Sequence, residues 1–260
     1  MNHSNSGQAD PHPEKKPLND LAFFASQAHD CGYLPDRSAV TLFADPEATM
    51  DMNMYSVLLE NGFRRSGIHV YRPHCPTCRA CQAARIPVDL FQPNRSQKRT
   101  LKKNTAIQTN ITKPAFHEEH FELYRKYMSS RHAGGGMDDP SVDKYMEFLT
   151  SIWAQTEFVE FRLDGQLMAV AVMDILPQSL SSVYTFFDPD HAELSLGRYA
   201  LLWQINEAQR RQIPHLYLGY WIKNCQKMIY KQEYRPIELY QDYRWYNYGR
   251  EQQLTAITTP

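Results

Sequence analysis

A predicted β-hairpin between residues 158 and 173 constrains the fold of this chain more than any other segment. Two apolar runs, 158–163 and 167–173, flank the dipeptide Asp164-Gly165. An Asp-Gly pair between two such runs favours a tight turn that joins antiparallel strands. A further apolar run at 182–187 predicts a third strand. The second half of the chain is therefore expected to contain a set of antiparallel strands.

Apolar residues with helical spacing precede and follow these strands. Their spacing predicts helices at 116–131, 141–153, 196–211 and 224–230, with a short strand at 215–220. The order of elements is similar to the core of the acyl-CoA N-acetyltransferases. That resemblance implies an α+β fold with an acetyltransferase-like (GNAT-like) C-terminal domain, in which a strand-to-helix turn receives the donor's phosphates. The corresponding segment here contains Gly197 and Arg198, although an ordinary helix start is the alternative.

Residues 18–104 differ in composition from the second half of the chain. Their apolar pieces are short and interrupted by six prolines, which favours strands and loops over long helices. Residues 51–62 are the exception and predict a helix, while 70–71 and 86–90 predict strands. The expected division is a disordered leader at 1–17, a smaller cysteine-containing basic domain at 18–104, an acetyltransferase-like domain at 105–250 and a flexible tail at 251–260.

Charge is strongly segregated, although the formal net charge is only −1. Residues 63–103 hold ten Lys or Arg and one acid, whereas residues 138–193 hold eleven acids and two bases. A basic block of this kind suits phosphate binding, because each neutralised phosphate releases counterions. A solvated basic surface is the alternative explanation.

Three of the five cysteines form a C-x-x-C-x-x-C run at Cys75, Cys78 and Cys81. Thiolates at this spacing can converge on one metal, and Cys31 would complete a four-ligand set for structural zinc or an iron–sulfur cluster. The alternative is a group of reduced thiols that pack as small apolar groups. Cys225 is distant in sequence and is expected to be structural.

Several ordered segments together resemble the tRNA-dependent aminoacyl-protein transferases, in particular their short bacterial leucyltransferase branch. The resemblance extends from about residue 22 to residue 245. The segments that carry it are 29–34 (HDCGYL), 71–81 (YRPHCPTCRAC), 85–88, 95–99, 174–177, 181–184, 194–199 (LSLGRY), 217–222 (YLGYWI), 225–231 and 234–236 (YRP).

The resemblance implies a specific activity. Leucine would move from leucyl-tRNA to the N-terminal α-amine of proteins that begin with Asp or Glu, and the product would enter the N-degron degradation pathway. The donor ester is already activated, and an α-amine has a reference pKa of about 7.7–8.0. Alignment of the two reactants is therefore expected to dominate catalysis, with no cofactor required for the chemistry.

Three tasks follow, and each has candidate residues. Asp174 and Tyr184 are candidates for deprotonating the amine and supporting the oxyanion. A cation must hold the acidic side chain of the acceptor, and the candidates are Arg131, His132, Lys227, Lys231 and Arg235. The tRNA is expected to bind Arg85, Arg95, Lys98, Arg99, Lys102, Lys103, Gly197 and Arg198.

Two other functions remain open at this stage. One is a non-enzymatic, metal-stabilised RNA-binding protein, which explains the basic block but leaves the second half without a role. The other is transfer of arginine in place of leucine. No apolar run approaches the length of a membrane span and residues 1–17 lack a signal-like apolar core, so a cytoplasmic protein without membrane or DNA partners is expected.

Overall fold

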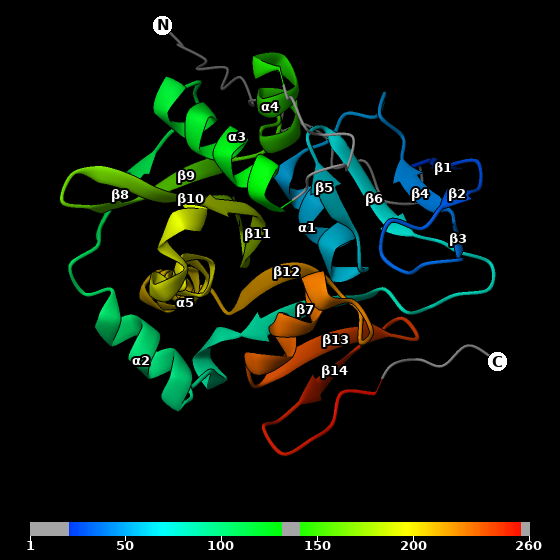
Figure 1. The fold of residues 1–260 in the computed structure, drawn as a ribbon. Helices are drawn as coiled ribbons and strands as arrows, with labels where there is room; N and C mark the ends of the chain where they lie inside the picture. Colours follow the sequence, from blue (N-terminus) through cyan, green and yellow to red (C-terminus); the bar gives the residue numbers. More distant parts are fainter. Residues whose placement is uncertain (1–20, 132–140, 256–260) are drawn as a thin grey trace, which may run out of the picture.

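Two main sheets organise the chain in the computed structural model, which describes residues 21–131 and 141–255 (Figure 1). The smaller sheet has the order β1-β4-β6-β5, with β1 Phe23–Ala25, β4 Thr41–Ala44, β5 Arg64–Ser66 and β6 His69–Pro73. A two-stranded ribbon, β2 His29–Asp30 with β3 Ser38–Ala39, lies beside it. Helix α1, Met52–Glu60, begins where the Asp51 carboxylate accepts the Met54 N–H. It confirms the helix predicted for this region.

The larger sheet has eight strands in the order β14-β13-β7-β12-β11-β10-β9-β8. Their bounds are β7 Gln82–Pro87, β8 Gln108–Thr112, β9 Thr156–Leu163, β10 Gln166–Leu176, β11 Ser179–Phe187, β12 His215–Trp221, β13 Ile237–Gln241 and β14 Arg244–Tyr248. The predicted hairpin is confirmed as β9–β10 and the predicted third strand as β11. Strand β7 joins this sheet between β12 and β13, although it comes from the expected first domain, so the boundary near residue 104 stays a prediction.

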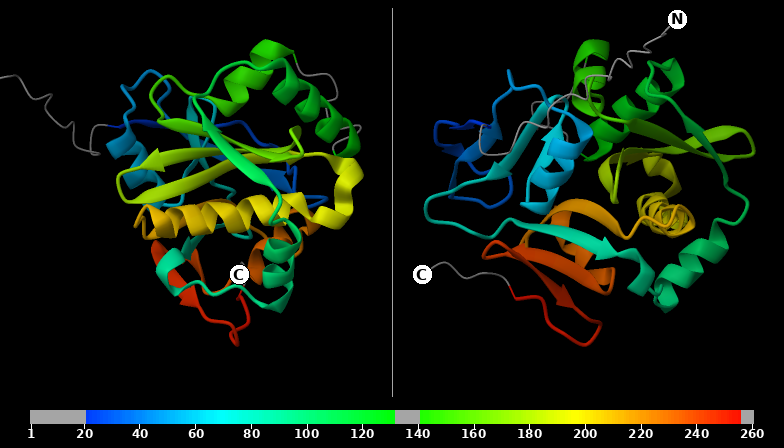
Figure 2. Two further views of the ribbon diagram at one scale, coloured as in Figure 1. Left: turned by 90° about the vertical axis from the view of Figure 1, so that its left-hand side faces the viewer. Right: turned by 180° about the vertical axis from the view of Figure 1, so that it is seen from behind.

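Helices cover both faces of the larger sheet (Figure 2). Helix α3, Glu118–Arg131, and helix α4, Val142–Leu149, pack on one face, and helix α5, Leu196–Arg210, packs on the other. Helix α2, Arg95–Lys103, contacts α5. The expected α+β class is thus confirmed. In the described part of the chain, no helix is long and apolar enough to cross a membrane.

Three local predictions need correction. The strand expected at 86–90 occupies 82–87, and residues 88–90 form the 3-10 turn η2 after Pro87. Helix α2 was not predicted, because its sequence is charged and lacks apolar spacing. The helix expected at 224–230 is short, with α6 at Gln226–Ile229 followed by the 3-10 turn η4 at Tyr230–Glu233. The expected leader at 1–17 lies outside the described residues, as does the end of the expected tail, 256–260.

A fully buried ion pair joins the two main sheets. Arg65 on β5 donates from Nε to Asp174 Oδ2 at 2.5 Å and from Nη2 to Asp174 Oδ1 at 2.6 Å. Both side chains are completely inaccessible to solvent. Arg65 also donates to the Leu149 carbonyl at the end of α4, and Thr156 Oγ1 donates to Asp174 at 2.8 Å. The pair therefore links β5, α4, β9 and β10 in one hydrogen-bonded network.

We expect Asp174→Asn to lower the free energy of unfolding by about 3–5 kcal/mol, because it leaves the Arg65 charge buried without a counter-charge. Equilibrium denaturation by urea measures the change. The control is Asp190→Asn, which removes an exposed partner of Lys126 and should cost less than about 1 kcal/mol. Similar losses for the two variants would contradict a special role for the buried pair.

Candidate functional site

The larger sheet opens between β11 and β12. These parallel strands pair only from Ser179 with His215 to Ser181 with Tyr217, and their continuations are not paired. The register of β12 against β7 also shifts between Tyr217 and Tyr220. Gly219 lies in this shift with a φ of +71°, a conformation that favours glycine. Parallel strands that separate in this way leave room for a ligand between them.

Arg64 on β5 lies beside this opening. Its guanidinium carbon is 5.8 Å from the ring centre of Tyr71 and 6.0 Å from that of Tyr220. A Cβ at Gly219 would lie 3.1 Å from Arg64 Nη1, so the glycine permits the close approach of the arginine. A small cavity next to Arg64 is bordered by Ser182 and Gly219. Within the described ranges, no carboxylate forms an ion pair with Arg64.

Lys231 is a second cation near Arg64. It is buried, with only 4% of its surface exposed, whereas Arg64 is half-buried. Its Nζ donates to the Tyr220 carbonyl and contacts Met228 Sδ at 3.4 Å. Burial, followed by the neighbouring Arg64 charge, lowers the Lys231 pKa to about 7. Residues 21–131 and 141–255 supply no carboxylate partner for this ammonium. One buried and one half-buried cation without a counter-charge are costly unless an anionic group binds between or beside them.

The start of α5 lies at the end of β11 and was an expected donor site. A Cβ at Gly197 would lie 2.8 Å from Phe187 Cε1, so this glycine brings the helix close to β11. Arg198 pairs with Glu233 at 2.7 Å and donates to Ser96 Oγ at 2.8 Å. Arg198 therefore ties α5 to α2 and η4, and part of its charge is already neutralised.

The two expected catalytic residues, Asp174 and Tyr184, are held by contacts inside the fold. Asp174 was expected near the sheet opening, but its carboxylate is buried and occupied by Arg65. It has no exposed surface from which to accept a proton from a substrate, and this corrects the expectation. Tyr184 packs against helix α3, where its hydroxyl contacts Met128 Sδ at 3.5 Å. Burial raises the Tyr184 pKa, which keeps the hydroxyl protonated near neutral pH and leaves no phenolate to accept the proton of the amine.

The five candidates for binding an acidic side chain separate in the structure. Lys231 lies at the opening, and Arg131 is exposed at the end of α3 with its guanidinium 5.5 Å from the Phe187 ring. Lys227 is exposed on α6. Arg235 donates to the Gln232, Tyr248 and Gly249 carbonyls and thereby holds the C-terminal hairpin. His132 lies outside the described residues.

The expected tRNA-binding residues also divide into two groups. Arg85 is bound by Glu238 at 2.6 Å and stacks 4.2 Å from the Trp245 ring centre, and Lys103 donates to the Glu193 carbonyl. Apart from Gly197 and Arg198 on α5, the others are exposed on α2 and form no ion pair with a carboxylate in the described part of the chain: Arg95, Lys98, Arg99 and Lys102. Helix α2 thus presents a basic surface whose charge is not neutralised.

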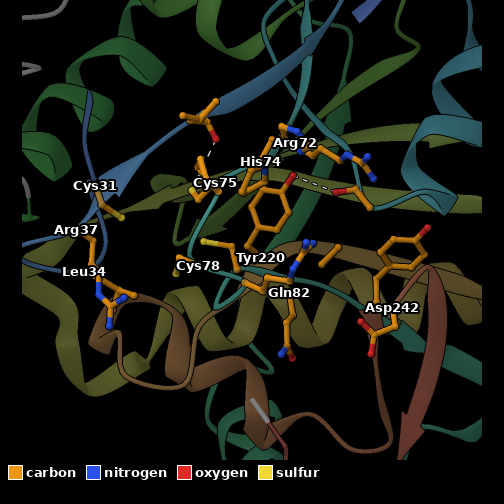
Figure 3. Close-up of a pocket in the computed structure, with 18 of the residues that line it drawn as sticks. Cys31, Leu34, Arg37, Arg72, His74, Cys75, Cys78, Gln82, Tyr220 and Asp242 are labelled. Atoms are coloured by element: carbon orange, nitrogen blue, oxygen red, sulfur yellow. Dashed lines mark hydrogen bonds between the residues drawn. The ribbon is translucent and has the colours of Figure 1, made fainter. Parts of the chain in front are cut away.

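The four N-terminal cysteines line one cavity of about 460 Å³ (Figure 3). The predicted proximity of Cys31 to Cys75, Cys78 and Cys81 is therefore confirmed. A group of three or more His, Cys, Asp or Glu side chains placed to hold a metal is not found among the described residues. Burial and the neighbouring thiols raise the pKa of Cys81 to about 12 in the metal-free protein. As arranged here, the thiols do not fit zinc or an iron–sulfur cluster.

Arg64, Gly219 and Tyr220 are site residues that the sequence patterns do not single out. Arg64 was counted in the basic block but could not be distinguished there from its neighbour Arg65. The segment 217–222 was recognised, yet only its position at the strand opening gives Gly219 and Tyr220 a role. The usable signal was the glycine inside an apolar strand, which often marks a bulge or a close approach.

We expect Lys231→Met to stabilise the protein at pH 7, by on the order of 3 kcal/mol. The folded pKa of Lys231 lies below its ordinary value of 10.5, so unfolding takes up a proton between pH 7 and 10.5 and wild-type stability rises across that range. The advantage of the variant should therefore shrink as the pH rises. Urea denaturation at several pH values measures the difference in stability between the variant and the wild type. A variant that is less stable than the wild type at pH 7 would contradict the view that the buried Lys231 charge destabilises the folded protein.

Solved structures with related folds superpose only partly on this chain. FemX gives a TM-score of 0.45 at 7% identity and covers 81% of this chain and 82% of that chain. L-PGS from Bacillus licheniformis gives a TM-score of 0.42 at 11% identity and covers 78% and 69%, respectively.

Sequence relatives are much closer. Residues 29–99 match the N terminus of arginine-tRNA-protein transferase, and residues 119–241 match its C terminus. The aspartate/glutamate leucyltransferases of Pseudomonas fluorescens strain Pf0-1 and Pseudomonas syringae pv. syringae strain B728a are each 56% identical over 225 residues, covering 86% of this chain and 96% of those proteins. The chain therefore belongs to the aspartate/glutamate leucyltransferases, whose two parts are those of the arginine-tRNA-protein transferases.

Proposed function

We infer that this protein transfers leucine from leucyl-tRNA to the N-terminal α-amine of proteins that begin with Asp or Glu. The observation that carries the inference is a pair of cations without a carboxylate partner in the described ranges, half-buried Arg64 and buried Lys231, beside the opening between β11 and β12. An acidic side chain supplies the counter-charge that this place lacks. The close relatives favour leucine over arginine as the transferred group, and the leucylated product would be destined for degradation.

Binding and alignment account for most of the proposed chemistry. The α-amine attacks the ester carbonyl of the aminoacyl-tRNA, the ester C–O bond breaks, and the ribose hydroxyl leaves with a proton. Arg64 and Lys231 hold the acidic side chain of the acceptor by charge-assisted hydrogen bonds. Nearby positive charge disfavours the ammonium form of the α-amine. Alignment of two bound reactants contributes on the order of 7–11 kcal/mol, so the proposal does not depend on a dedicated general base.

The tRNA is proposed to bind along α2. Arg95, Lys98, Arg99 and Lys102 are exposed on this helix without carboxylate partners in the described ranges. Helix α2 packs on α5, and Arg198 links the two helices through Ser96. A stem held on α2 would thus lie next to the start of α5, where the acetyltransferase-like fold receives its donor.

We expect the triple charge reversal of Lys98, Arg99 and Lys102 to glutamate to weaken leucyl-tRNA binding by about 10- to 100-fold at low salt. The salt slope of log K should fall by about two to three, one for each lost phosphate contact. Filter binding across a salt series measures both quantities. Lys113→Glu, an exposed control away from α2, should leave them unchanged. Equal salt slopes for the triple variant and wild type would place the tRNA elsewhere.

We expect Arg64→Gln to narrow the preference for acceptor peptides with N-terminal Asp over Asn. Loss of a hydrogen bond to a charged group costs about 1.5–3 kcal/mol, which corresponds to roughly a tenfold to hundredfold preference in the wild type. The ratio of kcat/KM for the two peptides, measured with labelled leucyl-tRNA, should fall toward one while tRNA affinity stays unchanged.

Two controls make this test specific. Arg235→Gln removes a cation that binds backbone carbonyls, and it should preserve the Asp-to-Asn ratio. Arginyl-tRNA offered to the wild type tests the donor, and faster transfer from arginyl-tRNA would contradict leucine as the transferred group. An unchanged Asp-to-Asn ratio in Arg64→Gln would assign the acidic side chain to another cation.

A further inference from the structure

The cavity that the four cysteines share has a strongly cationic wall, and we call it the thiol pocket. Arg37, Arg72 and Arg79 line it together with His74. In the part of the chain that the structure describes, none of these arginines forms an ion pair with a carboxylate. Asp242 is the acid that lines the opposite side of the cavity (Figure 3). The wall therefore carries more positive than negative charge.

Arg72 shows that this wall lacks hydrogen-bond partners as well as counter-charge. Its Nε is buried without an acceptor, and its Nη1 reaches the Asn61 carbonyl only at 3.4 Å. The guanidinium stacks 4.9 Å from the ring centre of Phe63, which fixes its orientation. A buried N–H without a partner is costly and points to an acceptor supplied by a ligand.

The thiols do not supply the missing negative charge. Burial raises the pKa of Cys81, which keeps that side chain in the neutral thiol form. Cys75 Sγ lies 3.7 Å from the Val40 carbonyl oxygen, within reach of a weak hydrogen bond. The counter-charge for the arginines must therefore come from a bound molecule or from solvent.

The thiol pocket adjoins the proposed binding place of the acceptor's first residue. Tyr220 lines the pocket, and its ring lies 6.0 Å from the Arg64 guanidinium carbon. The Tyr220 hydroxyl donates to the Gly62 and Tyr71 carbonyls, so the ring is held between the two places. One residue of extended chain spans about 3.3–3.6 Å, which allows the second and third acceptor residues to reach the pocket.

The tRNA surface proposed on α2 lies on the other side of the molecule. Figure 1 and the right-hand view of Figure 2 place the loop between β6 and β7, which carries Cys75 to Cys81, on the opposite side of the molecule from α2. Two macromolecular substrates must approach one reaction centre without colliding. The thiol pocket therefore suits the acceptor protein better than the tRNA.

We propose that the thiol pocket binds the residues that follow the acceptor's N-terminal Asp or Glu, and that its arginines select acidic over basic side chains there. The proposal rests on the proposed function, because it assumes that the first residue binds beside Arg64. It adds a second determinant of substrate choice. Proteins whose second or third residue is Lys or Arg would be poor acceptors even when the first residue is Asp.

Three peptides that differ only at the second residue test the proposal: Asp-Glu, Asp-Ala and Asp-Lys at the N terminus. We expect wild-type kcat/KM to fall in that order, with about a tenfold difference between the extremes, as for partly exposed charge pairs. Arg72→Gln should reduce the difference to about twofold. Because Arg72 is half-buried, the double variant Arg37→Gln/Arg79→Gln, at two exposed positions, provides the same test with less risk to folding. Arg244→Gln, an exposed control on β14, should keep the wild-type ratio.

The outcomes distinguish failure of the present proposal from failure of the proposed function. Equal kcat/KM for the three peptides in the wild type would overturn the present proposal and leave the proposed function intact, because transfer would still occur. Absence of transfer to every Asp peptide would overturn both. Variants in the pocket that lose leucyl-tRNA affinity but keep the peptide ratio would assign the arginines to tRNA phosphates and overturn the proposal.

Discussion

The buried ion pair between Arg65 and Asp174 is the interaction on which the arrangement of this protein depends. It joins the smaller sheet to the centre of the larger one, and its hydrogen bonds reach the end of α4 and the start of β9. Neighbouring residues of a strand point to opposite faces. The same ion pair that directs Arg65 into the core therefore directs Arg64 toward the sheet opening. A structural contact thus positions the cation that we assign to substrate binding.

Turn residues and apolar spacing predicted those parts of the fold in which the paired segments are close together in the sequence. The β9–β10 hairpin and helix α5 follow from turn residues and apolar spacing within one segment. Insertion of β7 between β12 and β13 joins residues more than 120 positions apart, and no spacing inside β7 encodes it. Helix α2 is different, because its capping box of Asn94 and Gln97 was present in the sequence. The residues that follow the capping box are mostly charged and show no apolar periodicity, so apolar spacing alone does not predict this helix.

The candidate site was only partly predictable for a related reason. Sequence counts the cations in a region but does not show which of them already have partners. Arg85 and Arg198 form ion pairs with acids from β13 and η4, whereas Arg64 and Lys231 have none in the described ranges. Asp174 is the converse case: it was expected to act on the substrate, but it is bound by Arg65, which is 109 positions away in the sequence. Tertiary contacts decide whether a charged side chain already has an ion-pair partner. In this protein, paired side chains hold the fold together, and unpaired ones are the candidates for substrate binding.

The same distinction explains why a chain with a formal net charge of −1 can suit two anionic partners. Within the acidic block 138–193, Glu157 pairs with Arg211, Glu160 with Arg162 and Asp188 with Lys126. These contacts neutralise acids inside the protein. The cations of α2 and of the thiol pocket keep their charge, because no described carboxylate contacts them. The electric field near these two surfaces is therefore set by the unpaired charges and not by the net charge of the chain. Because the two surfaces lie on opposite sides, the tRNA and the acidic acceptor can each be attracted without competing for the same cations.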